Sequence, residues 1–188
     1  SFQKIIKQTV IIYLMPHAVT HVLFPLVLVD LYRNYLHKAK KIHLHYVLIA
    51  GLAGLLPDID VVVYWLLNSF MSISLSDIHR TFTHTLFFPL IFLIIGFFTK
   101  GIKVKIYKDK LKLNWVFYMI AFGIFTHLIL DAVLAGSIKP FYPFSYYEIG
   151  LNLIKNNLEG TLLPGIDAIL LFIWLIHLEL KHKISDYI

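Results

Sequence analysis

The stretch that decides the fold is Leu55-Leu56-Pro57-Asp58-Ile59-Asp60, which places two carboxylates inside an apolar run from Tyr46 to Phe70. A charged side chain at the centre of a bilayer costs roughly 2.5–3.5 kcal/mol on insertion scales, so such residues are rare and are usually paired or functional. Histidines and a further aspartate occur in other apolar segments, where they can serve as partners. The pattern predicts that these carboxylates and imidazoles share a metal ion.

The composition is that of a membrane protein. Of 188 residues, 59% are hydrophobic and 15% aromatic, and the mean hydropathy is +0.75, whereas soluble domains are about 45–50% apolar. The net charge of +6 comes from Lys and Arg clusters between apolar runs, a distribution that sets membrane topology. It does not form an extended basic face, so no nucleic-acid partner is expected. The chain has no cysteine, so a metal would be held by nitrogen and oxygen ligands.

Five apolar segments predict an all-α, polytopic membrane bundle of about five transmembrane helices, in one domain spanning residues 1–188. The segments cover roughly residues 10–30, 44–68, 84–99, 113–135 and 161–179. Segments near twenty residues match the thickness of the hydrocarbon core. The first is expected to be a retained helix, because no small-residue cleavage site follows it. The second is expected to break near Pro57, and a broken membrane helix is tolerated where it lines a cavity.

The basic residues predict the orientation. Most of them lie in the loops 31–43 and 100–112 and in the C-terminal tail. Five spans place these three regions on one side, which the positive-inside rule makes cytoplasmic. The N-terminus is then outside, and every intramembrane ionisable group of interest falls in the outer half. The sequence therefore predicts a multi-pass protein of the inner or plasma membrane, with one site in its extracytoplasmic half.

Two pairs have helical spacing, His17 with His21 and His127 with Asp131. Residues four apart stack on one face of a helix, so each helix can offer two ligands to one point. The simpler alternative is a hydrogen-bonded core histidine. An aspartate four residues from His127 favours ligation or orientation of its imidazole.

Asp58 and Asp60 would lie about 200° apart on a regular helix. Both can face one site only if the helix is broken, and Pro57 supplies the break. Two neighbouring carboxylates repel each other unless a cation or a proton separates them. A divalent cation resolves that conflict; the alternative is a capping pair at a kink.

The segment His79-Arg80-Thr81-Phe82-Thr83-His84 has its histidines five residues apart, which does not place them on one helix face. A loop-to-helix boundary fits better, with Thr81 or Thr83 as the cap. Arg80 lies between the two histidines and would suit a phosphate oxygen. Its alternative role is that of an arginine that extends to the headgroup level.

The remaining polar features are interpreted as interfacial. The loop 139–147 is aromatic and proline-rich, which is typical of an aromatic belt, with a lid over the site as the alternative. Five histidines lie among lysines at or beyond the cytoplasmic ends of the segments, where a catalytic role is not expected: His37, His43, His45, His177 and His182.

Taken together, these motifs resemble the membrane-bound metal-dependent hydrolase family, which includes LexA-regulated inner-membrane hydrolases of bacteria and archaeal relatives. The resemblance covers about residues 15–150, and one local departure is Thr81, where the family has glycine. His127-x-x-x-Asp131 more remotely resembles the zinc phospholipase C and single-strand nuclease group. The resemblance implies these ligands or catalytic groups: His21, Asp58, Asp60, His79, His84, His127 and Asp131.

The expected function is hydrolysis of a phosphoester in a lipid or a lipid-linked phosphate. The metal would be Zn²⁺, with Mn²⁺ or Mg²⁺ as alternatives, and the ligands outnumber what one tetrahedral ion needs, which favours two ions over one. Asp60 or Asp131 would act as base or bridging ligand, and Arg80 would stabilise developing charge. Two alternatives stay open: a metal-ion carrier or sensor without chemistry, and a structural protein whose polar residues link its helices.

Overall fold

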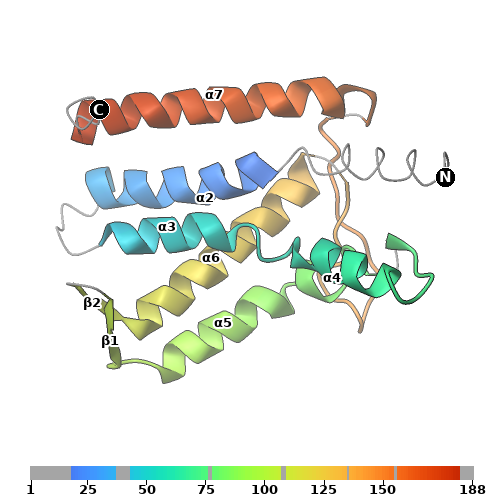
Figure 1. Ribbon diagram of the computed structural model, residues 1–188, viewed down its shortest axis with the longest axis horizontal. Coiled ribbons are helices and arrows are strands. Elements are labelled where there is room, and N and C mark those ends of the chain that lie inside the picture. The colour runs from blue at the N-terminus through green and yellow to red at the C-terminus, as the bar shows by residue number, and fades with distance from the viewer. Residues whose placement is uncertain are drawn as a thin grey trace.

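The computed structural model describes residues 18–36, 43–75, 78–106, 109–134, 136–154 and 156–182. The protein is mostly helical, as predicted, and its helices fall in the five apolar segments (Figure 1). The α-helices are α2 (Ala18–Leu31), α3 (Leu44–Ala53), α4 (Ile59–Asn68), α5 (Phe87–Phe98), α6 (Leu113–Val133) and α7 (Asn156–His182). A π-helical turn, η1 (Tyr32–Leu36), extends α2, and a 3₁₀ turn, η3 (Phe82–His84), precedes α5.

Within the described residues, α6 is the one helix that is both long and apolar enough to cross a membrane. The apolar helices α3, α4 and α5 are shorter, with 10, 10 and 12 residues. Helix length therefore does not confirm the predicted number of five spans.

The predicted break near Pro57 is confirmed. Helix α3 ends at Ala53, α4 begins at Ile59, and turns connect the two (Figure 1). Pro57 is fully buried in this connection. Asp58, the N-cap of α4, itself has αR backbone dihedrals, so the break before it does not remove the angle of about 200° that a helix gives between Asp58 and Asp60.

Helices α2, α3 and α6 form the core. Leu26, Val29, Val47 and Ala50 make a buried apolar cluster. At the end of α3, Gly54 lies so close to α2 that a Cβ atom would overlap with the carbonyl of His21. Small residues at such contacts let helix backbones approach closely, which is how helices associate inside a membrane.

A two-stranded hairpin, which the sequence interpretation did not include, connects α5 to α6. Strands β1 (Lys103–Ile106) and β2 (Asp109–Lys112) pair in antiparallel fashion. Lysines alternate with apolar residues here, the period of a half-buried strand, and Leu111 is fully buried beside Tyr46. The hairpin lies at the same end of the molecule as the C-terminal end of α7 (Figure 1).

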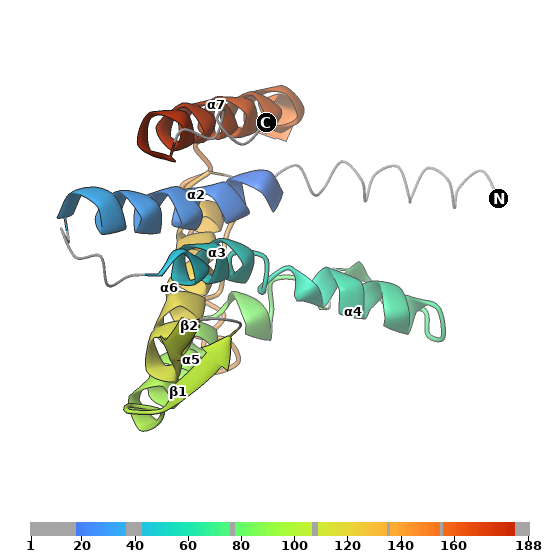
Figure 2. The same cartoon turned by 60° about the vertical axis from the view of Figure 1, so that its left-hand side comes forward.

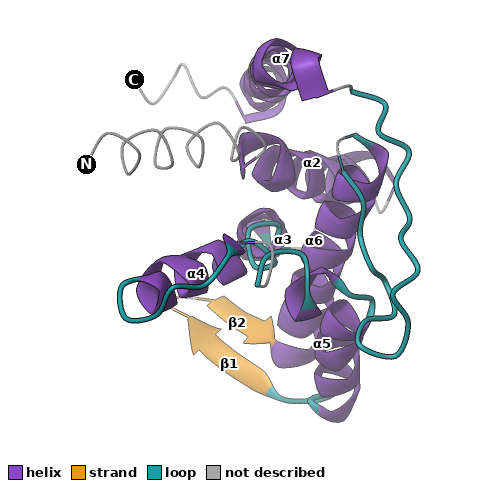
Figure 3. Cartoon of the chain, turned by 90° about the vertical axis from the view of Figure 1, so that its right-hand side faces the viewer, coloured by secondary structure: helices purple, strands orange, loops and turns teal. Residues whose placement is uncertain are grey.

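Helix α7 runs parallel to α2 and packs against it (Figure 1). Two polar pairs connect them: the Thr20 hydroxyl donates to Asp167, and His177 Nε2 lies 2.8 Å from Asp30 Oδ2. The loop 136–154 crosses one side of the bundle to connect α6 with α7 (Figure 3).

Candidate metal centre

Four parts of the chain meet at one end of the bundle and carry the predicted site residues. Helix α2 supplies His21 and α6 supplies His127 and Asp131. The turn between α3 and α4 supplies Asp58, and the first turn of α4 supplies Asp60. The segment 79–84 before α5 supplies His79, Arg80 and His84. Their side chains all lie together, whereas His17 falls outside the described residues.

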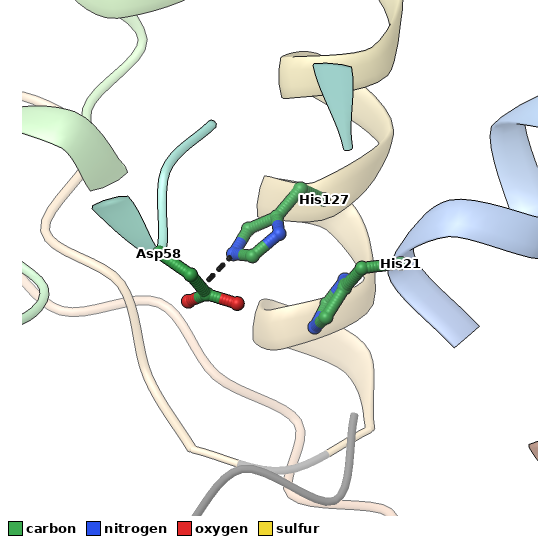
Figure 4. Close-up of side chains that lie close together, drawn as sticks. All are labelled: His21, Asp58 and His127. Carbon is green, nitrogen blue, oxygen red and sulfur yellow. Dashed lines mark ion pairs between the residues drawn. The ribbon is translucent and has the colours of Figure 1, made fainter. Parts of the chain in front are cut away.

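The centre of this cluster consists of two histidine nitrogens and two carboxylate oxygens. His84 Nε2 lies 3.2 Å from His127 Nε2, 3.4 Å from Asp131 Oδ2 and 3.7 Å from Asp58 Oδ1. His127 Nε2 lies 3.6 Å from the same oxygen of Asp58 and 3.6 Å from that of Asp131. Figure 4 shows Asp58 and His127 facing each other, with His21 beside them.

Five of the six separations in this group resemble those around a tetrahedral metal ion; among the described residues, no group of mutually close ligand atoms contains both Asp58 and Asp131. Ligands bound to Zn²⁺ at about 2.0–2.2 Å in a tetrahedron are about 3.3–3.6 Å from one another. The five separations above, 3.2 to 3.7 Å, lie close to that range. Imidazole nitrogen and carboxylate oxygen are also the ligand types left to a chain without cysteine.

The remaining ring nitrogens are held by acceptors outside the centre. His127 Nδ1 lies 2.6 Å from the carbonyl oxygen of Gly54. A carbonyl only accepts, so Nδ1 is the donor in this contact, and Nε2 is the nitrogen that faces the centre. His84 Nδ1 lies 3.2 Å from Asp60 Oδ2, which orients this imidazole in the same way. Such outer contacts fix the ring orientation of metal-binding histidines.

Asp60 occupies this outer position and not the centre. Its Oδ2 accepts from the backbone N–H of Arg80 at 3.2 Å and the hydroxyl of Thr83 at 2.9 Å, in addition to its contact with His84. Its Oδ1 lies 3.0 Å from His79 Nδ1. A carboxylate has about four lone-pair sites, so these partners occupy its capacity. The geometry favours Asp60 as a group that orients the ligands, whereas the sequence analysis predicted that Asp60 is itself a ligand or a catalytic group.

His21 joins the cluster from the side of α2. Its Nε2 lies 3.3 Å from Asp131 Oδ1, and its ring stacks on that of His127 with centroids 3.8 Å apart. Three overlapping groups are close enough to hold an ion: His21 with Asp58 and His127, Asp58 with His79 and His84, and His84 with His127 and Asp131. A second ion would therefore share ligands with the first.

Arg80 and His79 lie on the more accessible side of the cluster. The Arg80 and His79 side chains are 31% and 24% exposed, whereas His84 is fully buried. Arg80 Nε lies 3.6 Å from Asp131 Oδ2. The backbone of Arg80 has φ of 61°, a left-handed conformation that is costly for a residue with a Cβ and is found most often at functional sites.

Two contributors to the site were missed from the sequence. Gly54 orients His127 through its carbonyl, and Thr83 donates to Asp60. Thr81 or Thr83 was expected as a helix cap; Thr81 is the N-cap of η3 but makes no side-chain capping bond, and Thr83 lies inside η3. Backbone carbonyls carry no sequence signal, so the role of Gly54 required the fold.

A second polar cluster lies farther along α2. Asp30 is fully buried and contacts His177, Asn34 at 3.1 Å and Arg33 at 3.5 Å. The sequence interpretation placed His177 at the interface among lysines. The sequence does contain a signal for this contact: Asp30 is a carboxylate inside an apolar segment, so a polar partner for it was to be expected.

The loop after α6 carries exposed aromatic side chains. Phe144, Tyr146 and Tyr147 are exposed, and Phe144 also contacts Phe87 at the start of α5. Hydrogen bonds from the Ser137 hydroxyl and from Lys139 lower the pKa of Glu148 in this loop. Exposed aromatic residues next to a membrane helix are typical of an interfacial anchor.

A family model described as YdjM inner membrane protein matches residues 15–183. The matched range includes every predicted site residue. No curated protein and no solved structure matches the chain.

Proposed function

The chain belongs to the YdjM inner membrane protein family, and from this premise we propose that it is a multi-pass, metal-dependent hydrolase that cleaves a phosphoester in a lipid or a lipid-linked phosphate. The observation that carries the proposal is the central group of His84, His127, Asp58 and Asp131. The near nitrogens of its two histidines lie 3.2 to 3.7 Å from each other and from one oxygen of each aspartate, close to the separations around a tetrahedral ion.

The outer contacts support a site that is formed before the metal binds. Gly54 and Asp60 hold the far nitrogens of the two central histidines. A network that served only to join helices would not need the near nitrogens of both rings to converge on two carboxylates. The arrangement instead matches the ligand and outer-contact pattern of metal enzymes.

A divalent cation held here, Zn²⁺ or alternatively Mn²⁺ or Mg²⁺, would lower the pKa of a water molecule and polarise a phosphoryl oxygen. Residues of the chain would bind the phosphate, stabilise the developing charge and transfer a proton. Arg80 would bind the phosphate and stabilise negative charge that develops on it. His79, oriented by Asp60, is placed to move a proton at its outward ring nitrogen.

The position of the site supports a lipid substrate. The basic β1–β2 hairpin lies at one end of the molecule, and the end of α6 that carries the site lies at the other (Figure 1). The positive-inside rule places that hairpin in the cytoplasm. We therefore propose an extracytoplasmic site, which a lipid headgroup can reach laterally.

The test is the metal content of detergent-purified protein, measured by mass spectrometry. Wild-type protein is expected to hold about one to two equivalents of metal, since one tetrahedral ion takes four ligands. Asp58→Ala and His127→Ala should lose it. His177→Ala is the matched control, because His177 is a histidine that also pairs with a buried aspartate. Metal that persists in both site variants would contradict the proposal.

The second cluster favours one alternative, a metal-ion carrier. Asp30 lies nine residues after His21 on α2, about 13 Å along the helix, so polar groups occur at two levels of the bundle. The residues between them, among them Leu23, Leu26 and Val29, are buried and apolar, which disfavours a path for ions. Metal uptake into proteoliposomes that His177→Ala abolishes would favour the carrier over the hydrolase.

A further inference from the structure

Helix α4 starts at the candidate metal centre and then leaves the bundle. Asp58 precedes its first residue, and Asp60 lies in its first turn. Figure 2 shows α4 projecting away from the other helices. Only Asp60, Val61 and Tyr64 of this helix are buried, so most of its surface is exposed in the part of the chain that the structure describes.

The uncovered surface of α4 is apolar from its first residue. Ile59, Val62, Val63 and Leu66 are 49%, 46%, 41% and 62% exposed. Their spacing of three and four residues places them in one stripe along the helix. We call these four residues the α4 stripe. It begins next to Asp58, so an apolar surface continues directly from the candidate metal centre.

The length of α4 fits one leaflet of a membrane. Ten residues at about 1.5 Å each extend about 15 Å, which is half of the roughly 30 Å hydrocarbon core. A helix that crossed the membrane would be twice as long. The acyl chain of a lipid occupies the same half of the core.

The start of α4 also carries the cationic group of the site. The backbone N–H of Arg80 donates to Asp60 in the first turn of α4, and the Arg80 side chain is partly exposed. A guanidinium binds phosphate oxygens through planar, bidentate hydrogen bonds. One end of α4 thus offers an anion-binding group, and the length of the helix offers an apolar surface.

We propose that the α4 stripe binds an acyl chain of the lipid substrate, with the phosphate of that lipid at Arg80 and the metal centre. The inference rests on the proposed function for the identity of the phosphate end. It names the substrate as an anionic glycerophospholipid, bound by both its headgroup and its tail.

A second apolar surface is less suited to this role. A groove of about 970 Å³ lies between α2, α5 and α6, lined by residues that include Leu28, Leu90 and Phe122. At 100° per residue, its α6 residues Tyr118, Phe122 and Phe125 lie on the other side of the helix from His127. The groove is therefore separated from the metal centre by α6.

Photo-cross-linking of the full chain in detergent tests the proposal. The probe is phosphatidic acid with a diazirine in one acyl chain, and the comparison probe is diacylglycerol with the same chain. The protein is loaded with metal, and the phosphatidic acid probe carries a phosphonate in place of its phosphate ester so that no turnover occurs. Labelled peptides are mapped by mass spectrometry. Phosphatidic acid should label residues 59–66 and diacylglycerol should not.

Four variants locate the two ends of the lipid. Arg80→Gln should lower labelling about tenfold, the ratio that corresponds to about 1.4 kcal/mol for a lost charge-assisted hydrogen bond. Lys139→Gln, an exposed cation outside the site, should not. Leu66→Gln should lower labelling, whereas Leu93→Gln, which changes an exposed leucine of α5 that lines the α2, α5 and α6 groove, should not.

Each contrary result has a distinct meaning. Equal labelling by both probes, or labelling that ignores Arg80→Gln, means contact with bulk lipid and overturns the proposal. Labels confined to the α2, α5 and α6 groove overturn it as well. Specific labelling by a protein that, loaded with metal, hydrolyses no lipid phosphate would refute the reaction and leave the binding surface standing.

Discussion

At the scale of single residues, His84 separates the two aspartates of the motif, one on the side of the centre and one on the outer side. Its Nε2 faces Asp58 and the centre, and its Nδ1 faces Asp60. The two carboxylates of the Asp58-Ile59-Asp60 motif therefore lie on opposite sides of one imidazole. Their pairing with histidines follows from the sequence, but their separate roles do not, because the sequence does not show which nitrogen of His84 each carboxylate meets.

Asp60→Asn tests the orienting role. An asparagine keeps the shape but removes the charge that faces His79 and His84, so zinc affinity should fall about 10–100-fold, as for other outer contacts of metal ligands. Competition with a chromophoric chelator measures the affinity. Complete loss of metal, as expected for Asp58→Ala, would identify Asp60 as a direct ligand instead.

At the scale of elements, most of the helices could be predicted and some of their limits could not. Apolar segment length located the helices, and Pro57 located the break. The hairpin β1–β2 was missed because its lysines were interpreted only as topology signals, although their alternation with Val104 and Leu111 has the period of a strand. The number of spans could not be settled because a broken helix divides one apolar segment into two short ones.

Gly54→Ala tests the close contact between α2 and the end of α3. The added Cβ would overlap with the His21 carbonyl, and displacement of Gly54 would also move the carbonyl that holds His127. We expect a loss of about 1–3 kcal/mol in unfolding free energy, the usual cost of overpacking. Gly165→Ala is the control, since a Cβ there meets no atom. SDS titration followed by circular dichroism measures the difference.

The contact between Asp30 and His177 should hold α7 to α2. A double-mutant cycle with Asp30→Asn and His177→Ala, measured by the same SDS titration, should give a coupling of about 0.6–1.7 kcal/mol, the range found for polar pairs inside membranes. Larger values are not expected, since Asp30 keeps Arg33 and Asn34 as partners. Strictly additive single-variant effects would show that the pair does not hold the helices together.

At the scale of the whole molecule, charge and chemistry are separated along the bundle. The lysines of the β1–β2 hairpin lie at one end, and the carboxylates and imidazoles of the candidate metal centre lie at the other, apart from the Asp30–His177 pair. This separation could be predicted because both patterns are visible in the sequence. The exposure of α4 could not, because composition does not distinguish an apolar helix inside the bundle from one outside it.

The orientation can be tested with the cysteine-free background of the chain. A cysteine at Lys105 in the β1–β2 hairpin should react with a membrane-impermeant maleimide only after the cells are permeabilised. A cysteine at Tyr146, exposed in the loop after α6, should react in intact cells. The opposite pattern would reverse the topology and place the site on the cytoplasmic side.

The distribution of ligands along the chain has a consequence for biosynthesis. Asp58 and Asp60 leave the ribosome early, whereas His127, which is 73 residues after Gly54, emerges only with α6. Until that helix inserts, the nascent chain holds two carboxylates in an apolar segment without the histidine and aspartate of α6. If the proposed metal binds, its capture would have to follow the insertion of α6, which carries His127 and Asp131.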